Sequence, residues 1–208
     1  AYGGPAASLN SLKKKFEGLK KADSILINPH KWLFIPFEVA CVIVKNKEHM
    51  KNTFSIVPEY LQGGTDKEER DDLMNYSIQL SKDFKALKVW MTIKTFGYEK
   101  IKKSIKKDIQ MAQYAYSIVE QDPLFTPLHY PDLSIFCFKY NSNSLNVSDS
   151  LLNKKITEMI EVDGRVFLSG TKINNENVLR INCVNHRREK KDINFLFKLL
   201  KEIGEKAI

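Results

Sequence analysis

The sequence has no long hydrophobic run and few cysteines. Its longest apolar stretch, residues 39–44, is far too short to cross a bilayer, and no signal-peptide pattern precedes it. The cysteines Cys41, Cys137 and Cys183 form no paired motif, which argues against a disulfide framework or a zinc site. We therefore expect no membrane partner and a reducing compartment, the cytoplasm.

Histidine is equally scarce. His30, His49, His129 and His186 lie far apart, and no two have the spacing that places a pair of ligands on one face of a helix. No metal site is predicted. The chain also lacks an initiating Met, and we expect the gene product to start upstream of Ala1.

Hydrophobic residues make up 43% of the 208 residues, which predicts a globular chain of one or two domains. The net charge of +8 comes from lysine-rich stretches such as residues 98–110. There Ile101, Ile105 and Ile109 recur at helical spacing, which leaves the lysines on the opposite, solvated face. A nucleic-acid interface would interleave aromatic or base-reading side chains with the basic ones, so no nucleic-acid partner is expected.

Periodicity and breaker residues predict the order of the elements. Short β-branched runs indicate buried strands at residues 24–27 and 39–44, and the pattern becomes mixed strand and helix after a boundary near residues 121–129. The further elements expected are a helix at 82–96 stopped by Gly97, a long helix ending before Pro123, a strand at 133–140, a helix at 150–162 ending at Gly164, strands at 166–173 and 178–185 joined across residues 174–177, and a last amphipathic helix carrying Ile193, Leu196, Phe197, Leu200 and Ile203.

Lys31 stands at the junction of the first two predicted strands, behind Asn28, Pro29 and His30 and in front of Trp32. A lysine in such a turn either extends into water or is held beside a pocket where its amine is used. The residue pattern alone leaves both interpretations open.

Five blocks give this junction a context: "AYGG" at the start, "ADSILINPHKWLF", "PEYL", "LSKDFKALKVWMTIKTFG", and "VLRINCVNHR" before the last helix. In order and spacing they resemble the group II pyridoxal-phosphate-dependent amino-acid decarboxylases, the family of aromatic L-amino-acid, tyrosine and glutamate decarboxylases. The resemblance spans essentially the whole chain. It implies the α/β fold type I of pyridoxal-phosphate-dependent transferases, which is aspartate aminotransferase-like. Residues 1–120 would be the C-terminal part of the large cofactor-binding domain, and residues 121–208 the small α+β domain.

The resemblance assigns cofactor contacts. Lys31 would form the Schiff base with the aldehyde of pyridoxal 5'-phosphate, which requires a partly desolvated amine. His30 and Asn28 would lie beside the cofactor phosphate, and Ala1 would pack against the pyridine ring. Ser81 would approach the phosphate of the neighbouring subunit, because the family's active sites lie at a homodimer interface.

Tyr60 is the second catalytic residue that the resemblance implies. Its loop, about residues 55–76, combines a glycine pair with a charged run, which suits a mobile segment, although composition alone favours a plain surface loop. In the family this segment is a lid, and the tyrosine returns a proton after carbon dioxide leaves. Relatives with Phe at this position form aldehydes. Tyr60 therefore favours plain decarboxylation, with the lid excluding water.

The chain departs from the family pattern in two respects. Asp83 replaces the second of two basic residues that commonly follow the serine of that block. The aspartate that pairs with the pyridinium nitrogen would lie two residues before Ala1, and the histidine that stacks on the ring also lies outside the sequence. The chain thus resembles the last half of a subunit, and an upstream segment of the same subunit is an implied partner.

The function expected is α-decarboxylation of an L-amino acid. An aromatic substrate is favoured, because the blocks at residues 90–97 and 178–187 look closer to the aromatic branch of the family. An aldehyde-forming enzyme, a relative acting on an acidic amino acid, and a non-catalytic subunit or fragment that supports dimerisation are the alternatives.

Overall fold

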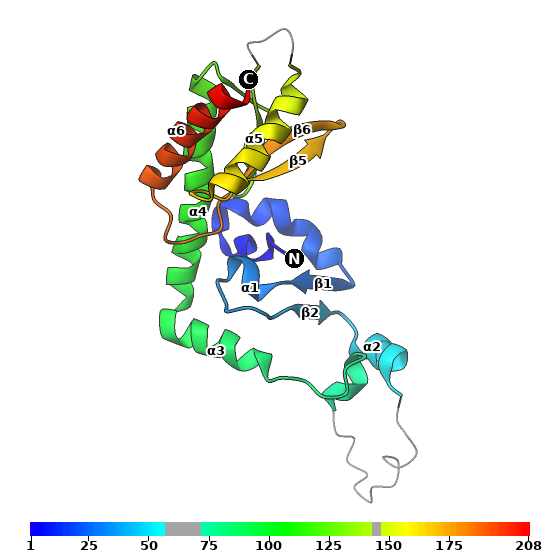
Figure 1. The fold of residues 1–208 in the computed structure, drawn as a ribbon. Coiled ribbons are helices and arrows are strands. Elements are labelled where there is room, and N and C mark those ends of the chain that lie inside the picture. Colours follow the sequence, from blue (N-terminus) through cyan, green and yellow to red (C-terminus); the bar gives the residue numbers. More distant parts are fainter. Residues whose placement is uncertain (57–71, 143–146) are drawn as a thin grey trace, which may run out of the picture. The chain divides into compact units, whose positions relative to one another are not determined.

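The computed structural model describes residues 1–56, 72–142 and 147–208, which form two compact units, Ala1–Tyr98 and Glu99–Ile208 (Figure 1). Almost all of the long helix α4 (Tyr98–Gln121) belongs to the second unit. The division at residue 120 between a large and a small domain stays a prediction. In the ranges described, no helix is both long and apolar enough to cross a membrane.

The first unit is built from short elements. They are η1 (Gly4–Ser8), η2 (Asn10–Lys21), β1 (Ser24–Ile27), α1 (Pro29–Trp32), β2 (Cys41–Val44), α2 (Lys47–Phe54), η4 (Leu73–Tyr76) and α3 (Lys85–Phe96). Strands β1 and β2 pair antiparallel, from Ser24 opposite Val44 to Ile27 opposite Cys41. Both predicted strands are confirmed, whereas η1, η2, α2 and η4 were not predicted.

The prediction that these two strands are buried is wrong for this chain. Leu26 is 49% exposed, Val42 53% and Ile43 51%. The reason is that the described residues place no layer over the side chains of this two-stranded sheet, since side chains stand on the faces of a sheet and need a packed layer to cover them. The buried apolar residues of this unit lie elsewhere, at Ala6, Leu9, Trp32, Ile35 and Val39.

Helix α3 confirms the helix predicted at residues 82–96, although it begins three residues later, at Lys85. Gly97 follows it with φ of 77°, a left-handed conformation that glycine adopts without steric cost. Much of the apolar side of α3 is exposed: Leu87 is 42% and Met91 52% exposed, and Phe84 just before the helix is 75% exposed.

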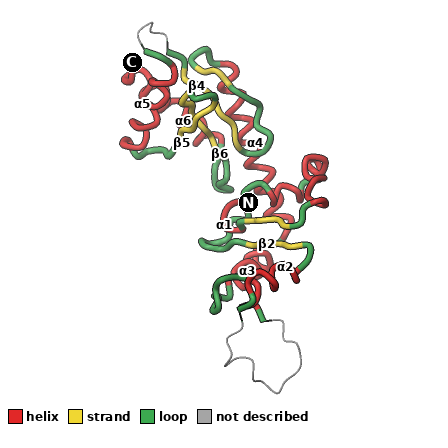
Figure 2. The backbone as a smooth tube through the Cα atoms, turned by 90° about the vertical axis from the view of Figure 1, so that its right-hand side faces the viewer, coloured by secondary structure: helices red, strands yellow, loops and turns green. Residues whose placement is uncertain are grey.

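The second unit contains a four-stranded antiparallel sheet. After α4 come β3 (Phe125–Pro127), β4 (Ile135–Tyr140), α5 (Asp149–Asp163), β5 (Ser169–Ile173), β6 (Glu176–Asn182) and α6 (Lys190–Ala207). The strand order is β3-β4-β6-β5. Strands β4, β5 and β6 are labelled in Figure 2. The predicted succession of elements is confirmed. Strand β3 was missed, because it is three residues long and ends in a proline, a residue that removes a ladder hydrogen bond.

Local chemistry explains two boundaries in this unit. Ser148 caps α5 by accepting a hydrogen bond from the Leu151 N–H at 3.3 Å, and Gly164 ends it with φ of 74°. The β5–β6 connection is tighter than the predicted four residues, because Ile173 already pairs with Glu176. Asn174 and Asn175 have φ of 51° and 64°, the positive values that a two-residue hairpin turn requires and that asparagine tolerates.

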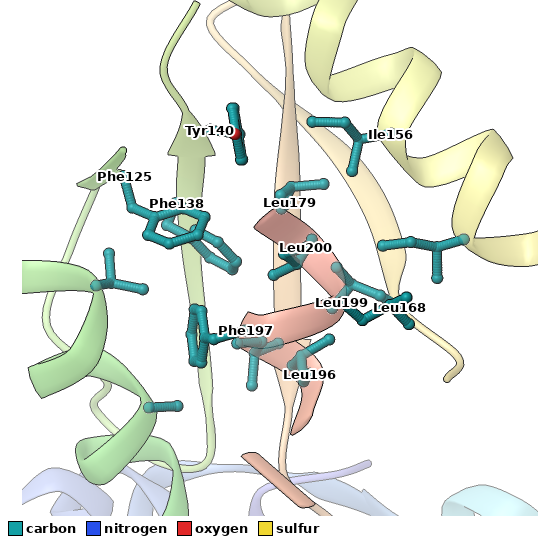
Figure 3. Close-up of a cluster of buried hydrophobic side chains, with 14 of the residues drawn as sticks. Phe125, Phe138, Tyr140, Ile156, Leu168, Leu179, Leu196, Phe197, Leu199 and Leu200 are labelled. Atoms are coloured by element: carbon teal, nitrogen blue, oxygen red, sulfur yellow. The ribbon is translucent and has the colours of Figure 1, made fainter. Parts of the chain in front are cut away.

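The core of the second unit combines aromatic and aliphatic side chains (Figure 3). Alternate residues of β4, Phe136, Phe138 and Tyr140, are fully or almost fully buried. The Phe125 ring lies 5.4 Å from the rings of both Tyr140 and Phe197, at near-perpendicular angles that favour aromatic pairs. Residues of α4, α5 and α6 complete this single cluster.

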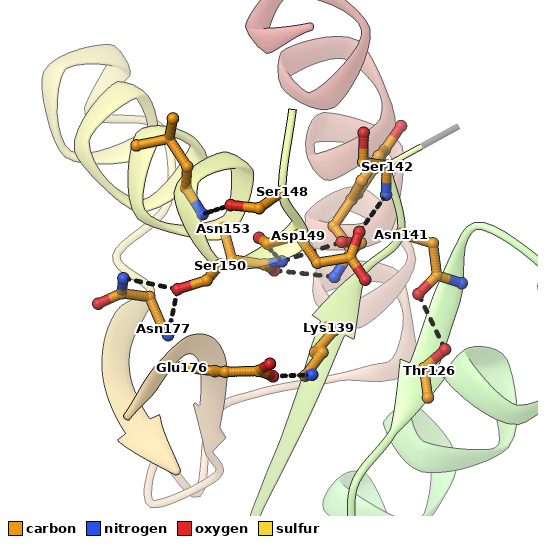
Figure 4. A network of polar contacts seen from close by, with 12 residues as sticks. Thr126, Lys139, Asn141, Ser142, Ser148, Asp149, Ser150, Asn153, Glu176 and Asn177 are labelled. Atoms are coloured by element: carbon orange, nitrogen blue, oxygen red, sulfur yellow. Dashed lines mark hydrogen bonds and ion pairs between the residues drawn. The ribbon is translucent and has the colours of Figure 1, made fainter. Parts of the chain in front are cut away.

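A buried amide joins α5 to the end of β4 (Figure 4). The Asn153 side chain accepts from the Tyr140 N–H at 2.8 Å and donates to the Tyr140 carbonyl at 2.9 Å. It also donates to the Asp149 carbonyl at 2.6 Å. Because Asn153 is fully buried, these bonds satisfy polar groups that water cannot reach.

Gly204 on α6 tests how tightly this core is packed. A Cβ atom at Gly204 would overlap the ring of Tyr140, whereas a Cβ at Gly18 on η2 would meet nothing within 4 Å. We expect Gly204→Ala to lower the free energy of unfolding by about 1–2 kcal/mol, because overpacking outweighs the gain in helix propensity. Gly18→Ala, the control, should be neutral or slightly stabilising. Urea unfolding of the full-length protein, followed by circular dichroism, measures both, and equal effects would refute the packing argument.

Candidate active site

Lys31 lies on α1, a single helical turn directly after β1 (Figure 1). Pro29 occupies the first helical position, where its missing N–H costs no bond, and the Lys31 N–H donates to the Asn28 carbonyl at 2.9 Å. The Lys31 side chain is exposed. We expected the Lys31 amine to be partly shielded from water. The described part of this chain does not shield it, because it leaves the side of α1 that carries Lys31 exposed to solvent.

Trp32 anchors this turn. Its side chain is fully buried and stacks on Tyr2, with ring centroids 4.7 Å apart and an angle of 12° between the planes. Lys31 immediately precedes Trp32 on the same turn, so the buried indole limits how far the turn can rotate. Tyr2 and Trp32 belong to two different sequence blocks, and the signal for their contact was the aromatic residue in each block.

A backbone hydrogen bond brings the start of the chain to the same place. The Asn28 N–H donates to the Ala1 carbonyl at 2.9 Å, so two predicted site residues that are distant in sequence lie together. The Asn28 Oδ1 atom is buried and has no hydrogen-bond partner among the described residues. A buried orphaned amide atom costs about 1–3 kcal/mol, and rotation of the amide presents either an acceptor or an NH₂ donor. This amide therefore has capacity for a polar ligand.

The His30 ring contacts a loop seven to nine residues further along the chain. Nδ1 lies 2.6 Å from the Val39 carbonyl oxygen and 3.0 Å from the Val39 nitrogen, and the ring lies 4.9 Å from that of Phe37. A protonated Nδ1 donates to the carbonyl, and an unprotonated Nδ1 accepts from the N–H. In either tautomer Nδ1 is hydrogen-bonded to the Val39 backbone, so Nε2 is the ring nitrogen that remains available for a ligand.

The same loop carries an ion pair that the sequence analysis did not anticipate. The Lys85 ammonium at the start of α3 lies 2.5 Å from the Glu38 carboxylate. Its hydrogen bond and charge lower the pKa of Glu38, and Glu38 in turn raises the pKa of Lys85. A lowered carboxyl pKa means that the pair is present at neutral pH and is lost only as the pH falls through that pKa.

Ser81 lies exposed in the segment before α3. Within the ranges that the structure describes, no hydrogen bond joins it to Asn28, His30 or Lys31. The neighbouring Lys82 donates to the Leu73 carbonyl at 2.6 Å, so the basic residue of this block is directed to η4.

Tyr60 and most of its predicted loop, residues 57–71, lie outside the described residues. On the flanks of this segment, the Ser55 hydroxyl donates to the Asn75 side chain at 3.0 Å. The structure thus brings together Ala1, Asn28, His30 and Lys31.

These four residues fit pyridoxal phosphate chemically. A primary amine can condense with an aldehyde, while an imidazole Nε2 and an uncommitted amide can contact a phosphate. The small Ala1 leaves room for a flat ring. No group of three potential metal ligands occurs in the portions of the chain that are described.

Comparison with known proteins relates the chain to one family. The model of the pyridoxal-dependent decarboxylase conserved domain matches residues 1–141. The aromatic-L-amino-acid decarboxylase of Bacillus atrophaeus is 29% identical over 210 residues, which cover 100% of this chain and 44% of the relative. The phenylacetaldehyde synthase of a Rosa hybrid cultivar is also 29% identical, over 86% of this chain and 37% of its own length.

Solved structures have a fold similar to that of this chain. The crystal structure of Oryza sativa TDC with PLP and tryptamine superposes with a TM-score of 0.90 at 24% identity, over 99% of this chain and 43% of that one. The likeness confirms the predicted fold type I architecture. The chain spans less than half the length of the relatives it matches. Because the family model covers well over half of its residues, the chain belongs to the pyridoxal-dependent decarboxylase family.

Proposed function

We propose that the full-length protein containing this chain is a pyridoxal-phosphate-dependent carboxy-lyase that converts an L-amino acid, with an aromatic one favoured, to its amine and carbon dioxide. The observation that carries this proposal is the placement of Lys31 on a one-turn helix that is anchored by Trp32 and flanked by Asn28 and His30. The name of the Bacillus atrophaeus relative supports the aromatic substrate.

Each residue has a separate task in this proposal. Pyridoxal phosphate, when bound, supplies a ring that accepts the electrons of the bond broken in the substrate. The Lys31 Nζ is the nucleophile that holds the aldehyde carbon. The His30 Nε2 and the Asn28 amide bind the phosphate, and Ala1 lies against the ring face. Ser81 is a further phosphate contact, made to the neighbouring subunit.

The fate of the substrate carbon depends on where it finds a proton. The Rosa relative is named as an aldehyde synthase and is as similar as the Bacillus decarboxylase, so overall similarity does not choose between amine and aldehyde. We assign the proton to the Tyr60 hydroxyl, since a phenol is neutral at physiological pH and can donate. Aldehyde formation is the second candidate function.

We further propose that the protein is a homodimer with its active site at the subunit interface. Around a surface hollow of about 420 Å³ the first unit exposes apolar side chains, including Phe37 at 82% and Phe84 at 75%. Exposed apolar surface of this kind marks interaction sites, and symmetric dimers are the commonest oligomers.

A cytoplasmic location is also proposed. Cys41, Cys137 and Cys183 are all free thiols. Burial raises the pKa of Cys137 and Cys183, so these two thiols stay protonated and inert. Free thiols suit a reducing compartment.

Replacing Lys31 tests the nucleophile. In full-length protein incubated with pyridoxal phosphate and then reduced with borohydride, we expect Lys31→Ala to abolish the added mass of the cofactor, because no amine is left to hold the aldehyde carbon. Intact-protein mass spectrometry measures this. The matched control, Lys20→Ala on η2, removes another exposed lysine and should retain stoichiometric labelling. Full labelling of Lys31→Ala would move the nucleophile elsewhere.

Replacing Tyr60 tests the proton donor. Tyr60→Phe keeps the ring and removes the hydroxyl, so we expect carbon dioxide release to continue while amine formation falls by about tenfold or more and aldehyde, ammonia and peroxide appear. Product analysis with an oxygen electrode distinguishes these outcomes, with the exposed Tyr130→Phe as the control. Amine production at the wild-type rate without oxygen consumption would contradict the assignment.

Charges placed in the apolar surface test the dimer. We expect the wild-type full-length protein to sediment as a dimer, and the double variant Phe84→Glu/Met91→Glu to dissociate, since burying unpaired carboxylates in an interface is unfavourable. Val162→Glu, at a residue 88% exposed on α5, should remain a dimer. A fully active wild-type monomer at assay concentration would overturn the proposal.

A further inference from the structure

Residues 37–39 are held at two points by partners that are distant in sequence. On one side, both backbone polar atoms of Val39 lie within hydrogen-bond distance of the His30 Nδ1. On the other, the Glu38 carboxylate binds the Lys85 ammonium across 47 positions of sequence. The two anchored residues are consecutive, so a change at one anchor alters the geometry of the other.

The orientation of His30 depends on this loop. Among the described residues, its Nδ1 contacts only Val39, and its ring packs on Phe37. Val39 is itself 4% exposed, so packing restrains its side chain, and the ion pair of the adjacent Glu38 restrains the backbone next to it. If the loop moves, the imidazole turns about its side-chain bonds and Nε2 is redirected.

We propose that Glu38 and Lys85 are positioning residues: their ion pair fixes residues 37–39, and the Val39 backbone then aims the His30 Nε2 at the phosphate of the cofactor. This inference rests on the proposed function and extends it, because it makes a residue at the start of α3 act on the phosphate contact beside Lys31. It predicts that loss of the ion pair weakens binding of the cofactor's phosphate group and leaves capture of its aldehyde unchanged.

The expected size of the effect follows from exposure. The side chains of Glu38 and Lys85 are 61% and 33% exposed, and ion pairs of this kind contribute modestly, equivalent to about twofold to fivefold in affinity. Salt should weaken the effect, since screening at about 1 M acts over roughly 3 Å.

The test compares two ligands on full-length protein. Pyridoxal phosphate and pyridoxal differ only in the phosphate, so the ratio of their dissociation constants isolates the phosphate contact from capture of the aldehyde. We expect Lys85→Met and Glu38→Gln each to weaken pyridoxal phosphate binding about twofold to fivefold and to leave pyridoxal binding unchanged. Lys88→Met removes the same charge one turn along α3, where the ammonium acts on Glu38 through charge alone and makes no ion pair with it, and should weaken pyridoxal phosphate binding clearly less than Lys85→Met.

Two substitutions of His30 distinguish the role of its Nδ1 atom from that of its Nε2 atom. Asparagine places a polar atom near the Nδ1 position, and glutamine places one near Nε2. His30→Asn should therefore keep the Val39 contact and lose about tenfold in pyridoxal phosphate affinity, while His30→Gln should lose less. In the His30→Asn background, Lys85→Met should have no further effect, because the group that it positions is gone. The charge-exchanged pair Glu38→Lys/Lys85→Glu should restore the affinity lost in either single variant.

Three outcomes would overturn the proposal. Lys85→Met could weaken both ligands equally, act just as strongly in the His30→Asn background, or be matched by Lys88→Met; each shows that the ion pair does not act through His30. If instead the wild-type protein retains neither ligand after borohydride reduction, the proposed function itself fails, and this inference fails with it.

Discussion

The burial of Trp32 is the constraint on which the rest of the candidate site depends. A one-turn helix has too few hydrogen bonds to hold itself in place, because nucleating a helix fixes several residues for each bond gained. The indole supplies what the backbone does not: it is fully buried and stacked on Tyr2. Lys31, one position before it, can be exposed and still have a defined place.

Around this anchor, apolar and polar interactions have separate roles. Packing of Trp32, Ile35 and Val39 fixes where the backbone runs, and the polar contacts then set directions. The Asn28 N–H ties Ala1 to the lysine-bearing turn, and Val39 holds the His30 ring. The second unit follows the same rule, with a core of aromatic and aliphatic side chains and a buried amide, Asn153 of α5, that is hydrogen-bonded to the end of β4.

Periodicity predicted most elements, because helices and strands are specified by local spacing. The helix after Lys82, the long helix ending before Pro123 and the helix ending at Gly164 all appear close to their predicted bounds. Burial was predicted less well. The apolar runs of β1 and β2 look like interior strands, yet their exposure depends on which neighbours a sheet has, and composition does not report that.

The sequence by itself determined the chemistry: an amine, an imidazole and an amide within four consecutive positions, in blocks whose order identified the family. Only the tertiary structure decided which residues distant in sequence come into contact at and around this site. Ala1 reaches Asn28, and Glu38 reaches Lys85, across stretches of chain that local spacing cannot relate. Glutamate and lysine are common on protein surfaces, so residue type alone does not predict which lysine pairs with Glu38. Their pairing follows from where α3 and the loop before β2 are placed by packing, a property of the folded chain as a whole.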